Sequence, residues 1–117
     1  MTEIMRNFIG GQWLATETAA ENRNPADPAD LIGLYARGGV AEVDLAVGAA
    51  REAQPAWAAA SPQLRADVLR RAGDMLLARA DEMGRLLARE EGKALGEAKG
   101  EALRAAQLFH FYAGEPL

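Results

Sequence analysis

Alanine supplies much of the apolar content of this 117-residue chain, and from Val40 onward apolar residues recur at the three- and four-residue spacing of a helix. Alanine is the strongest helix former, but its small side chain buries little apolar surface. Half of the residues are hydrophobic and only 6% are aromatic. Helices of this composition pack around a thin core, so we expect them to require a further surface to pack against.

Four helices are expected, and the first begins at Val40. We expect Pro55 to end this helix or to begin a new turn, because proline has no backbone N–H and disrupts a helix interior, and Trp57 to follow as an apolar anchor. Ser61 and Pro62 then have the residue types of an N-cap and of a first helical position. They predict the start of a second helix.

The second helix is expected to end around residues 78–80, a third to run from near Asp81 to Gly92, and the last from about Leu95 to Ala113. Glycine suits the left-handed residue that closes many helices, which places the end of the third helix at Gly92. The inward-facing residues of these three helices are expected to be apolar ones at helical spacing: Leu64, Val68, Leu69, Ala72, Met75, Leu76, Met83, Leu86, Leu87, Ala98, Ala102, Ala105, Phe109 and Tyr112.

The pattern of residues 1–39 predicts strands. Residues 7–14 alternate apolar and polar side chains around a Gly-Gly pair, which is typical of a short β-hairpin. Residues 15–30 contain proline, asparagine and aspartate and are expected to form a surface connection. A further strand is expected over 31–38. The chain therefore divides into a β-hairpin, a loop and a strand over 1–39, and a four-helix segment over 40–117.

Charge and residue usage exclude several classes of function. The chain has 13 basic and 17 acidic residues, a net charge of −4 and no basic block, so we do not expect it to bind nucleic acid through phosphates. It has no cysteine, which excludes disulfides, zinc–thiolate sites and a cysteine nucleophile within these residues. It has neither a signal-peptide pattern nor about 20 consecutive apolar residues, so we expect a cytoplasmic location and no membrane span.

The stretch around Gly92 and Lys93 contains residue types that can carry chemistry. Gly-Lys ends the phosphate-binding P-loop, but Leu87 stands where that loop needs its first glycine, and Ala94 where it needs serine or threonine. The stretch also lies between two expected helices, whereas the loop requires a strand before it. A helix end with a nearby lysine is the better interpretation.

The other candidate residues also have a structural explanation. The glutamates Glu90, Glu91, Glu97 and Glu101 are spaced so that most of them lie on a solvated helix face, while acid–base catalysis needs two carboxyls converging on a cleft. His110 is the only histidine and is expected to be partly exposed or packed, since no cysteine or second histidine accompanies it. From its residues alone, the chain is a helical scaffold without a catalytic set.

Short motifs lie in order along nearly the whole chain. They are N-x-I-x-G-x-W at 7–13, N-P-A followed by I-G at 24–33, an alanine-rich helix ending in Trp57, R-x-x-x-L-x-x-A at 65–72, E-x-G-K-x-x-x-E-A at 90–98 and Y-A-G at 112–114. In this order and spacing they resemble the N-terminal part of the NAD(P)-dependent aldehyde dehydrogenase family. The sequence from Arg89 to Glu115 is most similar to that of semialdehyde-oxidising members, including ketoglutarate-semialdehyde types.

The resemblance implies an α/β family fold, in which this chain is mostly α-helical and forms the helical layer and β-hairpin of an incomplete Rossmann-like cofactor domain. It implies NAD or NADP as the cofactor of the parent enzyme, a cysteine thiolate that attacks the aldehyde, a glutamate base and an asparagine in the oxyanion hole. In the family those residues follow this segment. We therefore assign no catalytic and no cofactor-binding residue in this chain, and expect none to hold a cofactor by itself.

The resemblance also implies one candidate metal ligand. Some members hold a structural monovalent cation with a carboxylate of the last helix and with backbone carbonyls just before the N-P motif. Counting back from the Y-A-G motif, Glu101 occupies the carboxylate position, and Asn22 and Arg23 would offer the carbonyls. The remaining ligands would come from sequence that follows this segment.

The leading hypothesis is an N-terminal segment of an aldehyde dehydrogenase that oxidises an aldehyde or semialdehyde, inactive as the 117-residue chain alone. The alternatives are a free-standing helical interaction or oligomerisation module, and a regulatory fragment that pairs with the true enzyme. The expected partners are the remainder of such an enzyme or a second copy of this chain in a homo-oligomer, because several apolar faces lack the sheet they would pack on. Those faces carry Leu69, Leu76, Leu87, Phe109 and Tyr112.

Overall fold

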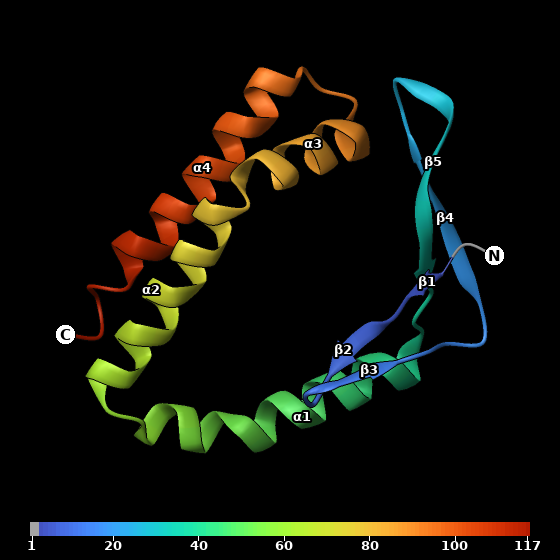
Figure 1. The fold of residues 1–117 in the computed structure, drawn as a ribbon. Helices are drawn as coiled ribbons and strands as arrows, with labels where there is room; N and C mark the ends of the chain where they lie inside the picture. The colour runs from blue at the N-terminus through green and yellow to red at the C-terminus, as the bar shows by residue number, and fades with distance from the viewer. Residues whose placement is uncertain (1–2) are drawn as a thin grey trace. The chain divides into compact units, whose positions relative to one another are not determined.

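The computed structural model of the chain describes residues 3–117, in which five strands precede four helices (Figure 1). This order confirms a mostly helical chain with a small β element at its N-terminal end. The chain forms two compact units, Met1–Ala58 and Ala59–Leu117. The first helix starts at Val40 as expected, but it belongs to the same compact unit as the strands.

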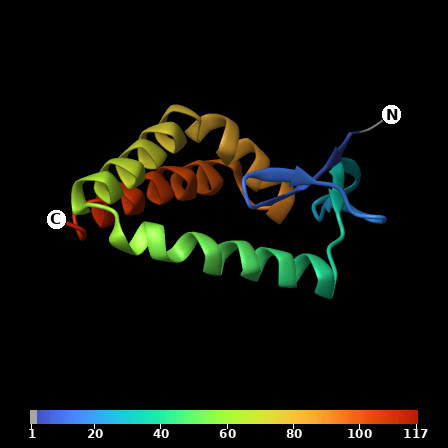
Figure 2. The same ribbon diagram turned by 90° about the horizontal axis from the view of Figure 1, so that it is seen from below.

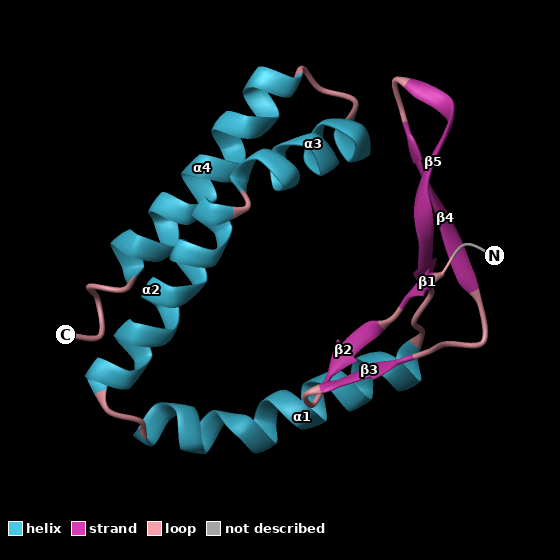
Figure 3. Cartoon of the chain, in the orientation of Figure 1, coloured by secondary structure: helices cyan, strands magenta, loops and turns pink. Residues whose placement is uncertain are grey.

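Three strands of the first unit form one sheet in the order β1-β5-β4, drawn in magenta in Figure 3. β1 (Ile4–Met5) runs parallel to β5 (Asp27–Ala36), and β4 (Ala19–Asn24) runs antiparallel to it. Gly33 is the buried residue of β5, and the ring of Tyr35 lies beside it: a Cβ at this glycine would be 3.2 Å from Tyr35 Cε2. The long strand β5 is the central strand of this sheet, because it pairs with both β1 and β4.

The β4–β5 pair corrects two expectations from the sequence. Residues 15–30 are not only a surface connection, because they contain β4 and the start of β5, and the strand expected over 31–38 begins earlier, at Asp27. The carboxamide oxygen of Asn24 accepts a hydrogen bond from the Ala26 N–H at 2.9 Å. Asparagine and proline therefore form a tight turn inside a hairpin here, with irregular pairing beside it, and do not mark a longer loop.

The β2–β3 hairpin confirms the prediction for residues 7–14. β2 (Asn7–Ile9) pairs antiparallel with β3 (Gln12–Leu14). Gly10 and Gly11 connect them with φ angles of 58° and 80°. These left-handed angles are the ones that a two-residue hairpin turn requires, and glycine adopts them without a steric cost.

Helix α1 (Val40–Ala59) continues through Pro55, so the expectation that this proline ends the helix or begins a new turn is wrong. Proline removes one backbone hydrogen bond, which frees the carbonyl of Arg51. Arg51 is exposed, so water can bond to that carbonyl, and only one further turn follows Pro55. No residue of α1 is buried, and Trp57 is 45% exposed.

The second unit consists of α2 (Pro62–Ala78), α3 (Ala80–Glu91) and α4 (Leu95–Tyr112). Helix α4 packs against both α2 and α3, as Figures 1 and 2 show from two directions. None of the helices in the described part of the chain is long and apolar enough to cross a membrane.

The ends of these helices follow the signals in the sequence. The Ser61 hydroxyl accepts a hydrogen bond from the Leu64 N–H at 3.2 Å, and Pro62 is the first residue of α2. Gly92 closes α3 with a φ of 67°, and its N–H donates to the Ala88 carbonyl at 2.9 Å. The predicted N-cap and the predicted left-handed C-cap are both confirmed.

Small residues form the core of the second unit. Its three helices bury Ala66, Gly73, Ala80, Gly84, Ala98, Ala102 and Ala106. No large side chain among residues 3–117 is fully buried. The helices approach closely: a Cβ at Gly84 would lie 2.6 Å from Lys99 Cγ, and a Cβ at Gly73 would collide with the His110 ring.

The predicted inward faces are correct only in part. Ala98 and Ala102 are buried as expected. Several larger residues expected inside are instead exposed, because close helix contact selects the smallest side chains and leaves the large ones outside the contact. The exposed ones are Leu64, Val68, Met75, Phe109 and Tyr112, and the half-buried ones are Leu69, Ala72, Leu76, Met83, Leu86, Leu87 and Ala105.

Candidate functional site

The junction between β5 and α1 is where a strand leads through two glycines into a helix, an arrangement that binds phosphates in many proteins. Here the helix supplies its own anion: Glu42 Oε2 accepts a hydrogen bond from the Gly39 N–H at 2.6 Å. This bond lowers the pKa of Glu42. The space beside Gly38 is also filled, since a Cβ there would lie 3.2 Å from Glu42 Cβ and 3.3 Å from Asn7 Nδ2. These residues cap a helix and do not fit a nucleotide phosphate.

Lys93 joins the end of α3 to α4. Its Nζ lies 2.6 Å from Glu101 Oε1 and 2.6 Å from Glu91 Oε2. The hydrogen bonds to Glu101 and then to Glu91 raise the pKa of Lys93, so its ammonium stays charged across the physiological range. The Gly92–Lys93 stretch is therefore a fixed connection between two helices, as the sequence indicates.

Glu101, the candidate cation ligand, is already paired with an ammonium group. Asn22 and Arg23 lie on β4 in the other compact unit, and the Arg23 guanidinium bonds Glu21 at 2.8 Å. Within residues 3–117, no three histidine, aspartate or glutamate side chains are grouped so that they could hold a metal ion. A cation at Glu101 would have to replace the Lys93 ammonium, and this assignment stays a prediction.

His110 on α4 contacts Asp74 on α2, with 2.9 Å between Nε2 and Oδ1. The two side chains are 36% and 64% exposed, which confirms that His110 is partly exposed. Such a pair can orient an imidazole, but a catalytic triad also needs a nucleophile beside it. The shallow hollow here has a volume of about 350 Å³ and is otherwise lined by Arg70, Ala113 and Gly114, none of which is a nucleophile.

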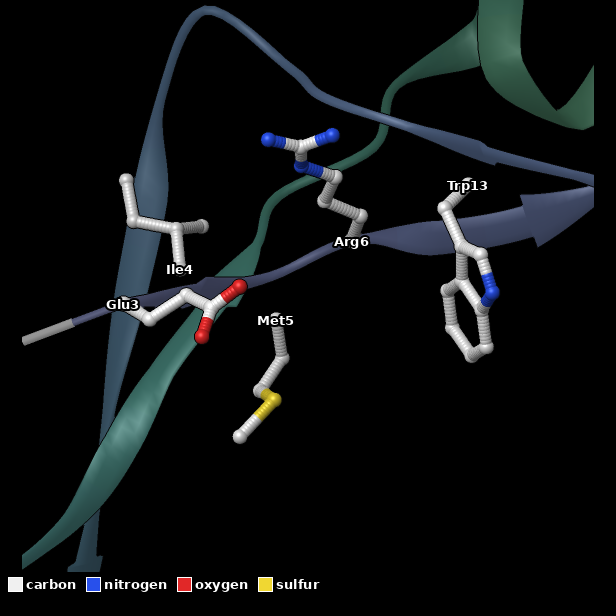
Figure 4. Close-up of a pocket in the computed structure, with 5 residues that line it drawn as sticks. All are labelled: Glu3, Ile4, Met5, Arg6 and Trp13. Carbon is white, nitrogen blue, oxygen red and sulfur yellow. The ribbon is translucent and has the colours of Figure 1, made fainter.

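A second hollow, of about 360 Å³, lies beside β1 and is lined by Glu3, Ile4, Met5, Arg6 and Trp13 (Figure 4). Figure 4 shows Met5 and Arg6 extending to opposite sides of the chain. Met5 is 52% exposed and Trp13 is 64% exposed. The lining combines apolar side chains with one acid and one base and contains no histidine or hydroxyl nucleophile, so it offers a surface and not a reaction centre.

Two adjoining hollows of about 340 and 380 Å³ lie on the second unit, and Leu76 and Met83 line both. We call them together the helical groove. The first is completed by Ala72, Met75, Arg79 and Phe109, and the second by Leu86, Leu87, Glu90, Glu101, Ala102 and Ala105. The groove therefore collects large apolar residues that the sequence placed inside the helix layer.

Comparison with known proteins identifies the family. Residues 13–117 match the aldehyde dehydrogenase family. The chain is 36% identical over 117 residues to the alpha-ketoglutarate semialdehyde dehydrogenase of Haloferax volcanii, covering 98% of this chain and 24% of that protein. It is 36% identical over 111 residues to the alpha-ketoglutaric semialdehyde dehydrogenase of Bacillus subtilis, covering 93% and 23%. The chain belongs to the aldehyde dehydrogenase family.

Solved structures agree with this assignment. An NADP-dependent enzyme of E. coli has a TM-score of 0.90 at 35% identity, over 95% of this chain and 23% of that one. An NAD-dependent aldehyde dehydrogenase of Sinorhizobium meliloti, at 24% identity, has the same fold with a TM-score of 0.91, over 98% and 24%. The resemblance found in the sequence is confirmed, and the chain spans about a quarter of the length of these relatives.

Proposed function

We propose that this chain is the N-terminal part of an aldehyde dehydrogenase that oxidises an aldehyde or semialdehyde to the acid with NAD⁺ or NADP⁺. The family match over residues 13–117 carries the proposal. Two similar curated proteins are named as ketoglutarate semialdehyde dehydrogenases, which supports a semialdehyde substrate. A benzaldehyde dehydrogenase of Corynebacterium glutamicum, 30% identical to this chain, is NAD-dependent, and the similar E. coli enzyme is NADP-dependent, which supports either cofactor.

We assign a supporting role to this segment within such an enzyme. The chain contains no cysteine, so a thiolate nucleophile has to come from other sequence. The β5–α1 junction is closed by Glu42, and the hollow beside the His110–Asp74 pair has no nucleophile in its lining. This segment supplies closely packed helices and a strand-rich unit, and the rest of the cofactor-binding domain would pack against them.

A chimeric enzyme tests the proposal. The matching segment of the Bacillus subtilis relative is replaced by residues 1–117 of this chain. Formation of NADH or NADPH is then followed with alpha-ketoglutaric semialdehyde, the substrate in that relative's name, as substrate. We expect an active chimera, and no turnover from the 117-residue chain alone. The same enzyme with the segment deleted is the control. A folded but inactive chimera would contradict the proposed role, and turnover by the short chain alone would contradict the assignment of catalysis to other sequence.

An interaction module is the second candidate function, and the helical groove favours it because exposed apolar hollows mark association sites. The partner would be the remainder of an aldehyde dehydrogenase chain or a second copy of this chain in a homo-oligomer. We place the protein in the cytoplasm, without nucleic-acid or membrane partners. Light scattering on the purified chain tests self-association directly, independently of any activity.

A further inference from the structure

We propose that Lys99 is the lysine of this chain that aldehydes modify, and that two carboxylates protect Lys93 from the same reaction. The inference rests on the proposed function, because that function makes an aldehyde the substrate of the enzyme. It concerns a side reaction of the aldehyde with the protein itself and does not depend on turnover.

An aldehyde modifies a lysine through the neutral amine. The nitrogen lone pair adds to the carbonyl carbon, the two amine protons and the carbonyl oxygen leave as water, and an imine remains. An ammonium group has no free lone pair and cannot begin this reaction. Carboxylates that bond an ammonium favour its charged form and therefore slow the modification.

Few amines in this chain compete for an aldehyde. Among its 13 basic residues only Lys93 and Lys99 are lysines, and the others are arginines, whose guanidinium groups stay protonated. There is no cysteine to supply a thiolate. The two lysines and the α-amino group are therefore the amines that an aldehyde can modify.

Lys93 lies between carboxylates from both sides of the α3–α4 connection. Its Nζ is 2.6 Å from Glu101 Oε1 and 2.6 Å from Glu91 Oε2, and its side chain is 23% exposed. The bonds to Glu101 and then to Glu91 raise the pKa of Lys93. The neutral amine that an aldehyde requires is therefore rare at this position.

Lys99 on α4 is held by a single carboxylate. Its Nζ contacts Asp81 Oδ1 on α3 at 2.5 Å, and its side chain is 33% exposed. Asp81 also bonds Arg85 at 3.3 Å and is itself 67% exposed, so its charge is shared between two cations and screened by water. One shared carboxylate holds the Lys99 ammonium less firmly than two carboxylates hold that of Lys93.

Protection of Lys93 preserves the connection between α3 and α4 while the substrate is present. An imine at Lys93 would remove the ammonium protons that bond Glu91 and Glu101, and both links would be lost together. An imine at Lys99 would remove one link, to Asp81. The lysine with more contacts is thus the one that an aldehyde reaches less easily.

Reductive alkylation compares the two lysines directly. The 117-residue chain is treated with propanal and cyanoborohydride, which reduces each imine to a stable amine, at about pH 7.5, where an ordinary lysine is mostly protonated. Cleavage after arginine leaves both lysines on one peptide, residues 90–104, and mass spectrometry of its fragments gives the two rates. We expect Lys99 to react about fivefold faster than Lys93, a difference of the size that partly exposed ion pairs produce.

The same peptide is analysed in the chimeric enzyme without NAD⁺ or NADP⁺, and we expect the same order of rates. This second sample carries the segment within a whole enzyme. Lys93 reacting as fast as Lys99 in either sample would overturn the proposal.

A glutamine variant tests the cause of the protection. Glu101→Gln removes one negative charge at nearly constant side-chain size and should raise the rate at Lys93 about threefold, leaving Lys99 unchanged. Glu97→Gln is the matched control, because it removes the same charge from α4 outside both lysine ion pairs. Circular dichroism checks that both variants stay helical. An unchanged rate at Lys93 in a helical Glu101→Gln variant would overturn the assigned cause.

Asp81→Asn is the reciprocal test. It removes the carboxylate partner of Lys99 and should raise the rate at Lys99 while leaving Lys93 unchanged. A rise at both lysines would show that the α3–α4 contact has loosened and would contradict separate control of the two amines. None of these measurements is a turnover, so an inactive chimera would contradict the proposed function alone, and equal rates at the two lysines would contradict this inference alone.

Discussion

Helices α1 and α4 are both alanine-rich and similar in length, with 20 and 18 residues, yet α1 buries no residue and α4 buries three. The buried alanines of α4, Ala98, Ala102 and Ala106, repeat every four residues and so lie on one face. Across from them, Gly73 and Gly84 allow α2 and α3 to come close. Alanine content therefore does not predict burial by itself; a regular repeat together with a complementary small residue on the neighbouring helix does.

A glycine-to-alanine substitution where α3 contacts α4 tests this difference most strongly. Gly84→Ala in α3 should destabilise the second unit by about 2 kcal/mol, since its Cβ would lie 2.6 Å from Lys99 Cγ and 2.8 Å from Lys99 Cα. Urea unfolding followed by circular dichroism measures the change. An unchanged unfolding midpoint would mean that close contact between α3 and α4 does not hold this unit together.

Loss of a helix cap should have the next largest effect. Ser61→Ala removes the acceptor of the Leu64 N–H bond and should cost about 1 kcal/mol. Ser61→Asp keeps an acceptor at this position and should retain most of the stability. If alanine and aspartate gave equal stability, the cap of α2 would contribute nothing measurable.

Gly48→Ala in α1 is the counterpart of the first substitution and should act in the opposite direction. A Cβ at Gly48 meets nothing within 4 Å, so the change should stabilise α1 by about 0.5–1 kcal/mol through helix propensity alone. Hydrogen exchange of the α1 amides reports it. Destabilisation here would show that α1 has a packed face, which would remove the contrast with α4.

Acidification should produce the smallest effect, at the start of α1. The pKa of Glu42 is lowered by the Gly39 N–H, so its contribution to stability is present above the pKa of the unfolded chain and is lost as pH falls through the lower folded value. We expect the protection of the amides in the first turn of α1, taken relative to the intrinsic exchange rate at each pH, to fall between about pH 5 and pH 3. Glu42→Gln should remove this pH dependence, and its persistence in that variant would exclude Glu42 as the cause.

Local signals in the sequence predicted the features that depend on neighbouring residues. The Gly10–Gly11 turn, the Ser61 cap and the Gly92 helix end each need one residue type at one position, and all three are confirmed. The hairpin of β4 and β5 was missed, because its turn residues also occur in loops and its strands are paired through contacts that no local pattern shows. Pro55 was misjudged because an exposed last turn tolerates proline.

Features that depend on three-dimensional packing could not be read from the sequence. The pairing of Asp74 with His110 joins residues 36 positions apart and left no signal. The spacing of Gly39 and Glu42, by contrast, is that of a capping box with glycine at the cap, and it could have identified the closed helix start. The inward faces were misassigned because hydrophobic periodicity weights large side chains, whereas the helices of this chain meet through small ones.

A core of alanine and glycine also governs how the second unit responds to temperature. Unfolding such a unit exposes little new apolar surface, and apolar exposure is what makes the heat capacity of unfolding large and positive. Its free energy of unfolding should therefore change only slowly with temperature. In calorimetry, the increase in heat capacity on unfolding should be small for its number of residues.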